Sequence, residues 1–436
     1  MNAVDTIVAL SSAPGRAGIA VVRCSGPLVR FVIETIAGIV PRPRMASVRM
    51  LRGLAGEPID QAVLVFFEGP ESFTGEDLAE FHIHGSPAVT QLLISTLLTL
   101  TVSLRLAKAG EFTRRSLDAG KLTLAQVEAT IDLIDSDTEW QRQQAIAQLG
   151  GALEATVDRW RRVILSARMS IEAQIDFSDE DDVPENLVQR ARGEIETLVP
   201  QLEAVLGRAH YGERLREGFV VVLTGPPNSG KSSLLNAIAK RDVAIVSPIA
   251  GTTRDLIEVS LDLAGLPVTL IDTAGLRDSV DEIERLGMAR TRQRAAAADL
   301  VLWLNAPDLP RCEAGLAGAA QLVVYTKSDL SSSPPGGGLS VSVITDEGID
   351  ALVLAIRAQL LGREHPEPAL ISRERHRIAV SEAVGHLKQS LSKTSASVEL
   401  MAEDLRLASI ALERLIGEID SEDVLDAVFA GFCIGK

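Results

Sequence analysis

Short apolar runs separated by turns dominate the first part of the chain. Runs at 6–9, 19–22 and 62–67 have the length and composition of β-strands, and paired Gly and Pro residues lie between them. The uncharged stretch 88–104 carries too many Ser and Thr side chains for a membrane span, and it predicts a buried helix followed by a strand. We therefore predict an α+β domain over residues 1–118.

A helical period replaces this pattern from about Leu122. Apolar residues recur every three or four positions in two series, first Leu124, Val127, Ile131 and Ile134, then Leu153, Val157, Trp160, Ile164, Ala167 and Ile171. The period returns after about residue 370, and the interval between holds strand-like runs. This order predicts an α-helical bundle domain in two parts, 119–215 and 366–436, with an α/β domain inserted at 216–365.

A glycine-rich loop lies near the start of the inserted domain. Residues 225–232 read Gly-Pro-Pro-Asn-Ser-Gly-Lys-Ser, which fits GxxxxGKS, and they follow the apolar run 220–223. A strand, a glycine-rich turn and a helix in this order form an anion site, because backbone N–H groups and the helix dipole point there. Lys231 can reach the β- and γ-phosphates, and the Ser232 hydroxyl can hold Mg²⁺. The motif predicts a nucleotide-binding P-loop.

Three later elements complete a guanine-nucleotide site. The segment 251–255 (Gly-Thr-Thr-Arg-Asp) offers a Thr for Mg²⁺ and the γ-phosphate, and 272–275 (Asp-Thr-Ala-Gly) follows an apolar run. In 326–329 (Thr-Lys-Ser-Asp), the Asp329 carboxylate can accept from guanine N1–H and N2–H₂ together, which adenine cannot offer. The predicted GTP-binding residues are Asn228, Ser229, Gly230, Lys231, Ser232, Ser233, Gly251, Thr252, Thr253, Asp272, Thr273, Ala274, Gly275, Thr326, Lys327, Ser328, Asp329, Ser342 and Val343.

Hydrolysis needs a group that these motifs do not supply. Leu276 follows 272–275, at the position where Ras-like proteins place a Gln that orients the attacking water. A Leu side chain cannot orient water, so another group must do so, and the γ-phosphate charge still needs a cation. Asn228 in the P-loop has an amide oxygen that can ligate a monovalent ion.

The overall charge limits the partners of the chain. The formal net charge is −16, which argues against broad, nonspecific nucleic-acid binding but not against a local basic site. Two basic clusters are candidates, and for both we favour an ordinary solvated face: Arg42, Arg44, Arg49 and Arg52, and Arg159, Arg161 and Arg162. Three scattered cysteines and an N-terminus without a signal segment favour a cytoplasmic protein that does not enter membranes.

The motif order resembles the translation-factor class of P-loop GTPases, and a closer match extends it. Segments at 14–23, 72–80, 110–121, 272–287 and 432–436 resemble the bacterial MnmE (TrmE) family of tRNA-modification GTPases, over essentially the full chain. The resemblance implies that K⁺ takes the place of an arginine finger. It adds Ser247, Pro248, Ile249 and Ala250 to the GTP-binding residues. It also implies K⁺ ligands at Asn228, Ser247, Ile249 and Thr252, Mg²⁺ ligands at Ser232 and Thr253, and a water-orienting Glu284.

The same resemblance assigns the N-terminal domain and the tail. It implies that the domain forms a homodimer and binds 5-formyltetrahydrofolate or a methylenetetrahydrofolate donor through Arg23, Glu80, Lys121 and Lys436. A carboxylate such as Glu80 can take paired N–H donors of the pterin, while Arg23 and the lysines can meet the carboxylates of the glutamate tail. It also implies a catalytic Cys433, whose thiol beside a lysine can act as nucleophile or proton carrier.

The implied activity is modification of tRNA. With an FAD-dependent partner of the MnmG type, a K⁺-activated GTPase would add an aminomethyl or carboxymethylaminomethyl group to C5 of the wobble uridine. Two residues depart from the family pattern: Thr326 replaces Asn, so we expect weaker guanine binding, and Ser247 replaces Thr but keeps a hydroxyl. Two alternatives stay open, a ribosome-assembly GTPase that binds rRNA and a folate-binding aminomethyltransferase-like protein with a regulatory GTPase domain.

Overall fold

The computed structural model describes residues 5–176, 186–241, 257–272, 298–309, 320–330, 338–362, 368–393, 397–417, 428, 429, 432 and 435. The chain divides into two compact units, one of Met1–Ile131 with Ile416–Lys436 and one of Asp132–Leu415. The four-part division predicted from the sequence is finer than this and stays a prediction. Among the described residues, no helix combines the length and apolar composition that a membrane crossing requires.

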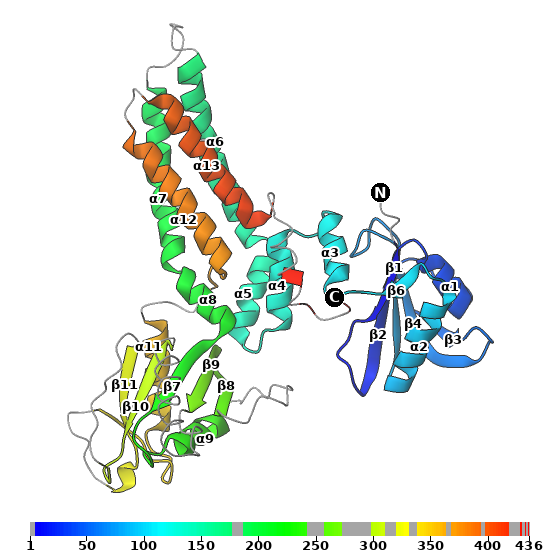
Figure 1. Ribbon diagram of the computed structural model, residues 1–436, viewed down its shortest axis with the longest axis horizontal. Helices are drawn as coiled ribbons and strands as arrows, with labels where there is room; N and C mark the ends of the chain where they lie inside the picture. Colours follow the sequence, from blue (N-terminus) through cyan, green and yellow to red (C-terminus); the bar gives the residue numbers. More distant parts are fainter. Residues whose placement is uncertain are drawn as a thin grey trace, which may run out of the picture. The chain divides into compact units, whose positions relative to one another are not determined.

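A mixed sheet of six strands forms the base of the first unit (Figure 1). The strands are β1 Thr6–Leu10, β2 Ala17–Ser25, β3 Ser47–Arg52, β4 Pro58–Phe67, β5 Leu78–Gly85 and β6 Leu104–Leu106. Their order is β3-β4-β5-β2-β1-β6, and every neighbouring pair is antiparallel except β1 and β6. The three apolar runs of the N-terminal sequence lie inside β1, β2 and β4, so these strand predictions are confirmed.

Helices cover the two faces of this sheet unequally. The helices of the unit are α1 Val29–Ala37, α2 Pro87–Leu100, α3 Glu111–Asp118 and α4 Leu124–Ile134. Helices α1 and α2 pack on one face, over a core that includes Val22 and Phe81. Because strand residues alternate between faces, Arg23 and Glu80 belong to the other face. There, α3 buries Phe112 against Ile7 of β1.

The last residues of the chain pack in the first unit. The rings of Phe429 and Phe432 stack with their centroids 5.6 Å apart and lie against Val127 of α4. A Cβ on Gly110, which has φ of 67°, would lie 2.7 Å from the Phe429 ring, so glycine allows this close approach. Phe429 and Phe432 are therefore part of the packing of the N-terminal unit.

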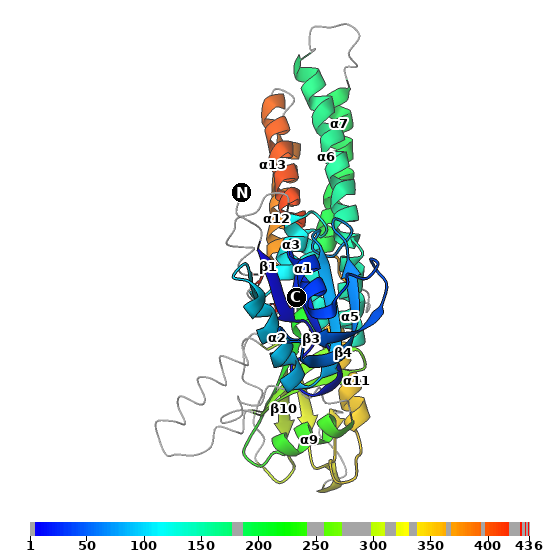
Figure 2. The same ribbon diagram turned by 90° about the vertical axis from the view of Figure 1, so that its right-hand side faces the viewer.

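Long helices make up much of the second unit. Its helices are α5 Glu139–Leu149, α6 Ala152–Asp176, α7 Leu187–Gly207, α8 Ala209–Glu217, α9 Lys231–Arg241, α11 Ile349–Leu361, α12 Glu374–Ser392 and α13 Val398–Ile416. Helices α6, α7, α12 and α13 run side by side (Figures 1 and 2). The six apolar residues of the predicted second series are all buried in α6, which confirms the helical seam.

The second sheet is a six-stranded α/β sheet within the same unit. Its strands are β7 Phe219–Thr224, β8 Ile257–Leu263, β9 Leu266–Asp272, β10 Leu300–Asn305, β11 Ala320–Tyr325 and β12 Leu339–Ser340. The order is β12-β11-β10-β7-β9-β8, with all neighbours parallel except β8 and β9. Helices α8, α9 and α11 contribute to its main core. The carboxyl ends of its parallel strands lie at one edge, where such sheets bind ligands.

Helix α5 holds both chain segments that flank this sheet domain. The side chain of Gln144 donates to the Gly212 carbonyl of α8, which leads into β7, and accepts from the Ala369 N–H, which follows α11. The Gln148 amide donates to the Ser372 hydroxyl at 3.0 Å. Both glutamine side chains are buried, so these bonds act where water cannot compete.

Candidate functional site

The P-loop joins the carboxyl end of β7 to the first turn of α9. Gly225 and Gly230 have φ angles of 148° and 91°, and Asn228 has one of 64°. A Cβ on Gly225 would lie 2.5 Å from the carbonyl oxygen of Leu304, so both the backbone angle and the space require glycine there. The loop leads directly into a helix N-terminus, whose first N–H groups have no partner within the helix.

Lys231 folds back over this loop. Its ammonium group donates to the carbonyl oxygens of Gly225 and Pro226 at 3.0 and 2.9 Å, and the residue is 7% exposed. It lines a pocket of about 430 Å³ together with Pro227, Asn228, Gly230, Ser232, Ser233 and Lys327. The ammonium group of Lys231 therefore lies where phosphate oxygens of a ligand in the pocket could bind it. Charged phosphate oxygens bind an ammonium group more strongly than neutral carbonyls do.

The carboxyl end of β9 brings a carboxylate to the P-loop. Asp272 is the last residue of β9 and is fully buried. Its Oδ2 accepts a hydrogen bond of 2.5 Å from the hydroxyl of Ser232 at the start of α9. Hydroxyl, carboxylate and water oxygens are the ligands that Mg²⁺ prefers, so this pair fits the metal predicted from the sequence.

The segment that follows β11 carries the motif predicted to bind the guanine base. Residues 326–329 follow β11, and Asp329 lies in a short 3₁₀ turn with Ser328. The fully buried Ser342 donates from its hydroxyl to Asp329 Oδ1 at 2.6 Å. This bond fixes the carboxylate that the sequence predicts as the guanine reader. Val343, the neighbouring predicted contact, is 40% exposed.

Thr326 joins the base motif to the P-loop. Its hydroxyl donates to the backbone carbonyl of Ser229 at 2.7 Å, and the residue is 4% exposed. Lys327 has φ of 55°, and its ammonium group pairs with Asp308 at 2.6 Å. The structure therefore gives the departure at Thr326 a positive role, because a buried hydroxyl ties two parts of the site together.

Several predicted site residues lie outside the described residues. These are the segment Ser247, Pro248, Ile249, Ala250, Gly251, Thr252 and Thr253, the segment Thr273, Ala274 and Gly275, and the single residues Glu284, Cys433 and Lys436. Their assignments stay predictions. The structure brings together Asn228, Lys231, Ser232, Asp272 and Thr326, which come from three strand ends of one sheet.

Arg23 and Glu80 form an ion pair on the open face of the N-terminal sheet. Glu80 Oε1 accepts from Nη2 and Nε of Arg23 at 2.8 and 3.1 Å, and Glu80 Oε2 lies 3.3 Å from Nε2 of His82. Arg23 and Glu80 thus lie side by side, and their predicted roles, Glu80 toward a pterin and Arg23 toward a glutamate tail, stay predictions.

Comparisons with known proteins agree over nearly the whole chain. A model described as "MnmE helical domain" matches residues 124–433, and one described as "GTP-binding protein TrmE N-terminus" matches residues 6–121. A protein of Beijerinckia indica named "tRNA modification GTPase MnmE" is 48% identical over 99% of this chain and 96% of its own length. The chain belongs to the MnmE family of tRNA modification GTPases. Relatives with the same name from Azorhizobium caulinodans and Phenylobacterium zucineum are 46% and 47% identical, over 99% of this chain and 99% and 100% of theirs.

Likeness to solved structures is slight by comparison. The G domain of the T. maritima FeoB iron transporter is 24% identical and covers 32% of this chain and 98% of its own, with a TM-score of 0.26. Membership of the MnmE family therefore rests on the sequence relatives. It agrees with the resemblance that the N-terminal segments, 272–287 and 432–436 carry.

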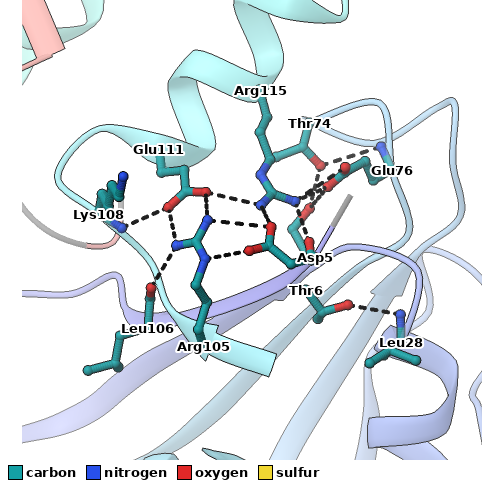
Figure 3. A network of polar contacts seen from close by, with 11 residues as sticks. Asp5, Thr6, Leu28, Thr74, Glu76, Arg105, Leu106, Lys108, Glu111 and Arg115 are labelled. Atoms are coloured by element: carbon teal, nitrogen blue, oxygen red, sulfur yellow. Dashed lines mark hydrogen bonds and ion pairs between the residues drawn. The ribbon is translucent and has the colours of Figure 1, made fainter. Parts of the chain in front are cut away.

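A network of charges holds the N-terminal unit of this MnmE family member together (Figure 3). Arg115 of α3 donates to Glu76 at 3.0 Å, to Asp5 at 2.9 Å and to Glu111 at 3.0 Å. Arg105 of β6 binds the other side of the cluster, reaching both Asp5 and Glu111 at 2.5 Å. The network joins β1, β6, α3 and the loop before β5, segments that are far apart in the sequence.

The network lowers the pKa of two carboxylates, those of Asp5 and Glu111. Burial by itself would raise the pKa of Glu111, but hydrogen bonds from Arg105, the Lys108 backbone and Arg115 outweigh it and hold the pKa at about 2. The pKa of Asp5 is lowered in the same way by Arg105 and Arg115, again against the effect of burial. Both carboxylates are therefore charged throughout the range in which the network stabilises the unit.

The tail lies beside the first strand. The Ser11 hydroxyl donates to the Gly435 carbonyl at 2.7 Å. A Cβ on Gly435, which has φ of 104°, would lie 2.0 Å from the Leu10 carbonyl oxygen. Ala9, next to Leu10, is the register partner of Arg23. The segment that ends the chain thus reaches the strand beside the Arg23–Glu80 pair.

Glu76, Glu111 and Arg115 lie in the family-like segments 72–80 and 110–121, but no sequence pattern predicted a role for them. One local signal was present, because Glu111 and Arg115 are four residues apart on a helix and such a pair interacts. Lys121, which was predicted, follows α3 directly and makes a backbone hydrogen bond to the Ser116 carbonyl.

Proposed function

We propose that this protein binds and hydrolyses GTP at the pocket between the P-loop and the ends of β9 and β11, and that it uses this cycle in the modification of tRNA. The observation that carries the proposal is the meeting of Lys231, the Ser232–Asp272 pair and the Asp329–Ser342 pair at one edge of a parallel sheet. These groups match the phosphates, the Mg²⁺ and the guanine base of one ligand. Membership of the MnmE family supports the link to tRNA.

The described residues have separate parts in GTP binding. Lys231 exchanges its loop carbonyls for phosphate oxygens, and the N–H groups at the start of α9 donate to the same phosphates. Ser232 would hold Mg²⁺ directly, and Asp272 would hold it through water. Mg²⁺ neutralises charge on the β- and γ-phosphates when bound. Asp329 accepts from the guanine N1–H and N2–H₂ while Ser342 keeps its carboxylate oriented.

We propose that hydrolysis depends on K⁺. Asn228 lies in the pocket and offers an amide oxygen, and the family resemblance adds Ser247, Ile249 and Thr252. K⁺ would supply positive charge beside the γ-phosphate, a task that an arginine performs in other GTPases. Glu284 would orient the attacking water, in place of the Gln that Leu276 excludes. Thr253 would complete the Mg²⁺ ligands.

We propose that the N-terminal unit binds the one-carbon donor. Glu80, with Arg23 at its side, would accept the paired N–H donors of a reduced pterin, and Lys121 and Lys436 would meet the tail carboxylates. The contacts of Phe432 and Gly435, its neighbours in the sequence, with the N-terminal unit support the proposal that Cys433 acts with this site. A homodimer acting with an FAD-dependent MnmG-type partner would install the aminomethyl or carboxymethylaminomethyl group on the wobble uridine in the cytoplasm.

One pair of assays tests this proposal. GTP turnover by the full-length protein is measured in K⁺ and in Na⁺, and wobble-uridine modification is measured with the partner, with and without GTP. We expect turnover to be many times faster in K⁺, and modification to need GTP. Equal turnover in both salts would refute the potassium step. Turnover without any effect on modification would instead favour a ribosome-assembly switch.

A further inference from the structure

An exposed aromatic ring lies beside the Arg23–Glu80 pair. Phe73, in the loop between β4 and β5, is 38% exposed. The guanidinium carbon of Arg23 is 5.5 Å from the centre of the Phe73 ring and 5.7 Å from that of Phe112, which is fully buried. The same cation thus contacts one buried ring and one open ring on the sheet face that carries Glu80.

The loop that carries Phe73 is held on both sides of it. The Ser72 hydroxyl donates to the Glu76 carbonyl, and Thr74 shares a hydrogen bond of 2.7 Å with the buried Ser25 of β2. The Glu76 carboxylate accepts from Ser25 at 2.9 Å and from Arg115 at 3.0 Å. Figure 3 shows Glu76 meeting Arg115, with Thr74 beside Glu76 on the same loop. The exposure of Phe73 is therefore built into an anchored loop.

An anchored, open aromatic ring beside a paired carboxylate suits a flat heterocycle. The ring face offers offset stacking, and the carboxylate offers an acceptor for N–H groups at the edge of the same heterocycle. Arg23 balances the charge of Glu80, so a ligand need not be cationic to bind there. A peptide or an inorganic anion would use one of these features, whereas a pterin uses both.

We propose that Phe73 is a further ligand-binding residue of this site and stacks on the pterin ring of the folate, while the Glu76–Arg115 ion pair positions it. The inference rests on the proposed folate function. Phe73 would recognise the face of the pterin ring, whereas Glu80 would recognise the N–H groups at its edge. Glu76 and Arg115 act through the loop and do not touch the ligand.

Binding of 5-formyltetrahydrofolate to the full-length protein, measured by calorimetry, tests the proposal. Phe73→Ala should weaken binding roughly tenfold, because a stacked aromatic pair is lost, and Phe73→Trp should bind about as well as the wild type. Phe31→Ala is the matched control, since Phe31 is 46% exposed on α1, over the opposite face of the sheet, and should change nothing. Glu76→Gln should weaken binding less than Phe73→Ala, and Glu76→Asp should restore part of the loss.

A second readout does not depend on the stability of the alanine variant. The natural tryptophans, Trp140, Trp160 and Trp303, all lie in the other compact unit. In Phe73→Trp, the ligand should therefore quench fluorescence beyond the change seen in the wild type. Wild-type binding with unchanged affinity in Phe73→Ala, or with no added quenching in Phe73→Trp, would overturn the inference. Absence of binding in the wild type would refute the folate function itself.

Discussion

The nucleotide pocket and the N-terminal charge network are built in opposite ways. In the pocket, each group comes from the carboxyl end of a parallel strand or the turn after it, as Lys231, Asp272 and Asp329 do. In the network, Asp5 directly precedes β1, Arg105 lies in β6 and Arg115 lies in α3, and they meet through the parallel pairing of β1 with β6 and the packing of α3. Local order along the chain places the first set, whereas tertiary packing places the second.

The two regions also differ in whether their polar groups are available to a ligand. Lys231 and Ser232 line an open pocket, so a ligand that enters it can replace their present partners. Groups in the network are matched by several opposite charges each and have little left to offer a ligand. We therefore expect substitutions in the pocket to change turnover, and substitutions in the network to change stability.

Lys231→Ala gives the largest expected effect. Loss of the ammonium group removes charge stabilisation of the transferring phosphate, which typically costs 10²- to 10³-fold in turnover. The measurement is steady-state GTP hydrolysis by the full-length protein, with thermal unfolding as a check. Lys240→Ala is the control, because Lys240 is exposed at the far end of the same helix. If Lys231→Ala lowered the thermal stability and left GTP turnover unchanged, the pocket would serve stability in the way that the network does, and the distinction between the two regions would be wrong.

Glu111→Gln tests the network. In the folded protein the pKa of Glu111 is about 2, below its ordinary value of 4.5, so the carboxylate stabilises the fold fully above pH 4.5, and this stabilisation is lost as the pH falls toward 2. The shift corresponds to about 3 kcal/mol at neutral pH. The measurement is the free energy of unfolding, obtained by chemical denaturation from pH 3 to 7. It should be lower in the variant at neutral pH, and it should fall less steeply in the variant than in the wild type as the pH is lowered.

Glu139→Gln is the matched control for that substitution. Glu139 also pairs with an arginine, Arg142 at 2.6 Å, and its pKa is likewise lowered, to about 2, by that hydrogen bond. The pair is about half exposed, so water and salt screen it and the substitution should change stability little. Equal losses from both variants would mean that burial of the network does not set its strength.

Thr326→Ala has the smallest expected effect of the three tests. The substitution leaves the buried Ser229 carbonyl without its hydroxyl donor, which costs about 1–3 kcal/mol. We expect GDP to bind roughly tenfold more weakly, measured with a fluorescent analogue. Thr326→Ser keeps the hydroxyl and should bind nearly as the wild type does. If the alanine and serine variants bound alike, the tie between base motif and P-loop would be unimportant.

The difference between local order along the chain and tertiary packing also explains which features the sequence could predict. The P-loop, the three strand ends and the buried seam of α6 follow from motifs and periods within short segments, and the structure confirms the strands and the helix. The network could not be found in this way, since Asp5 and Arg105 are 100 residues apart and Glu76 and Arg115 are 39 apart. The pairing of β1 with β6 brings the first two together, and the packing of α3 beside the loop before β5 brings the second two together.

The Arg23–Glu80 pair lies between these cases. Family resemblance named both residues, but their roles depended on a register that no local pattern reveals. Once β2 and β5 pair, the two side chains are neighbours and form an ion pair. Phe73 was missed for a related reason, because exposure of a loop residue depends on how the loop is anchored.

The most direct test of the account is the nucleotide preference of Asp329→Asn. Xanthine carries a carbonyl where guanine carries its 2-amino group, so an amide N–H in place of the carboxylate should match xanthine. We predict that GDP binds the variant at least tenfold more weakly than the wild type and that xanthosine diphosphate binds at least tenfold more tightly. Unchanged affinity for both nucleotides would contradict the guanine pocket on which the proposed function rests.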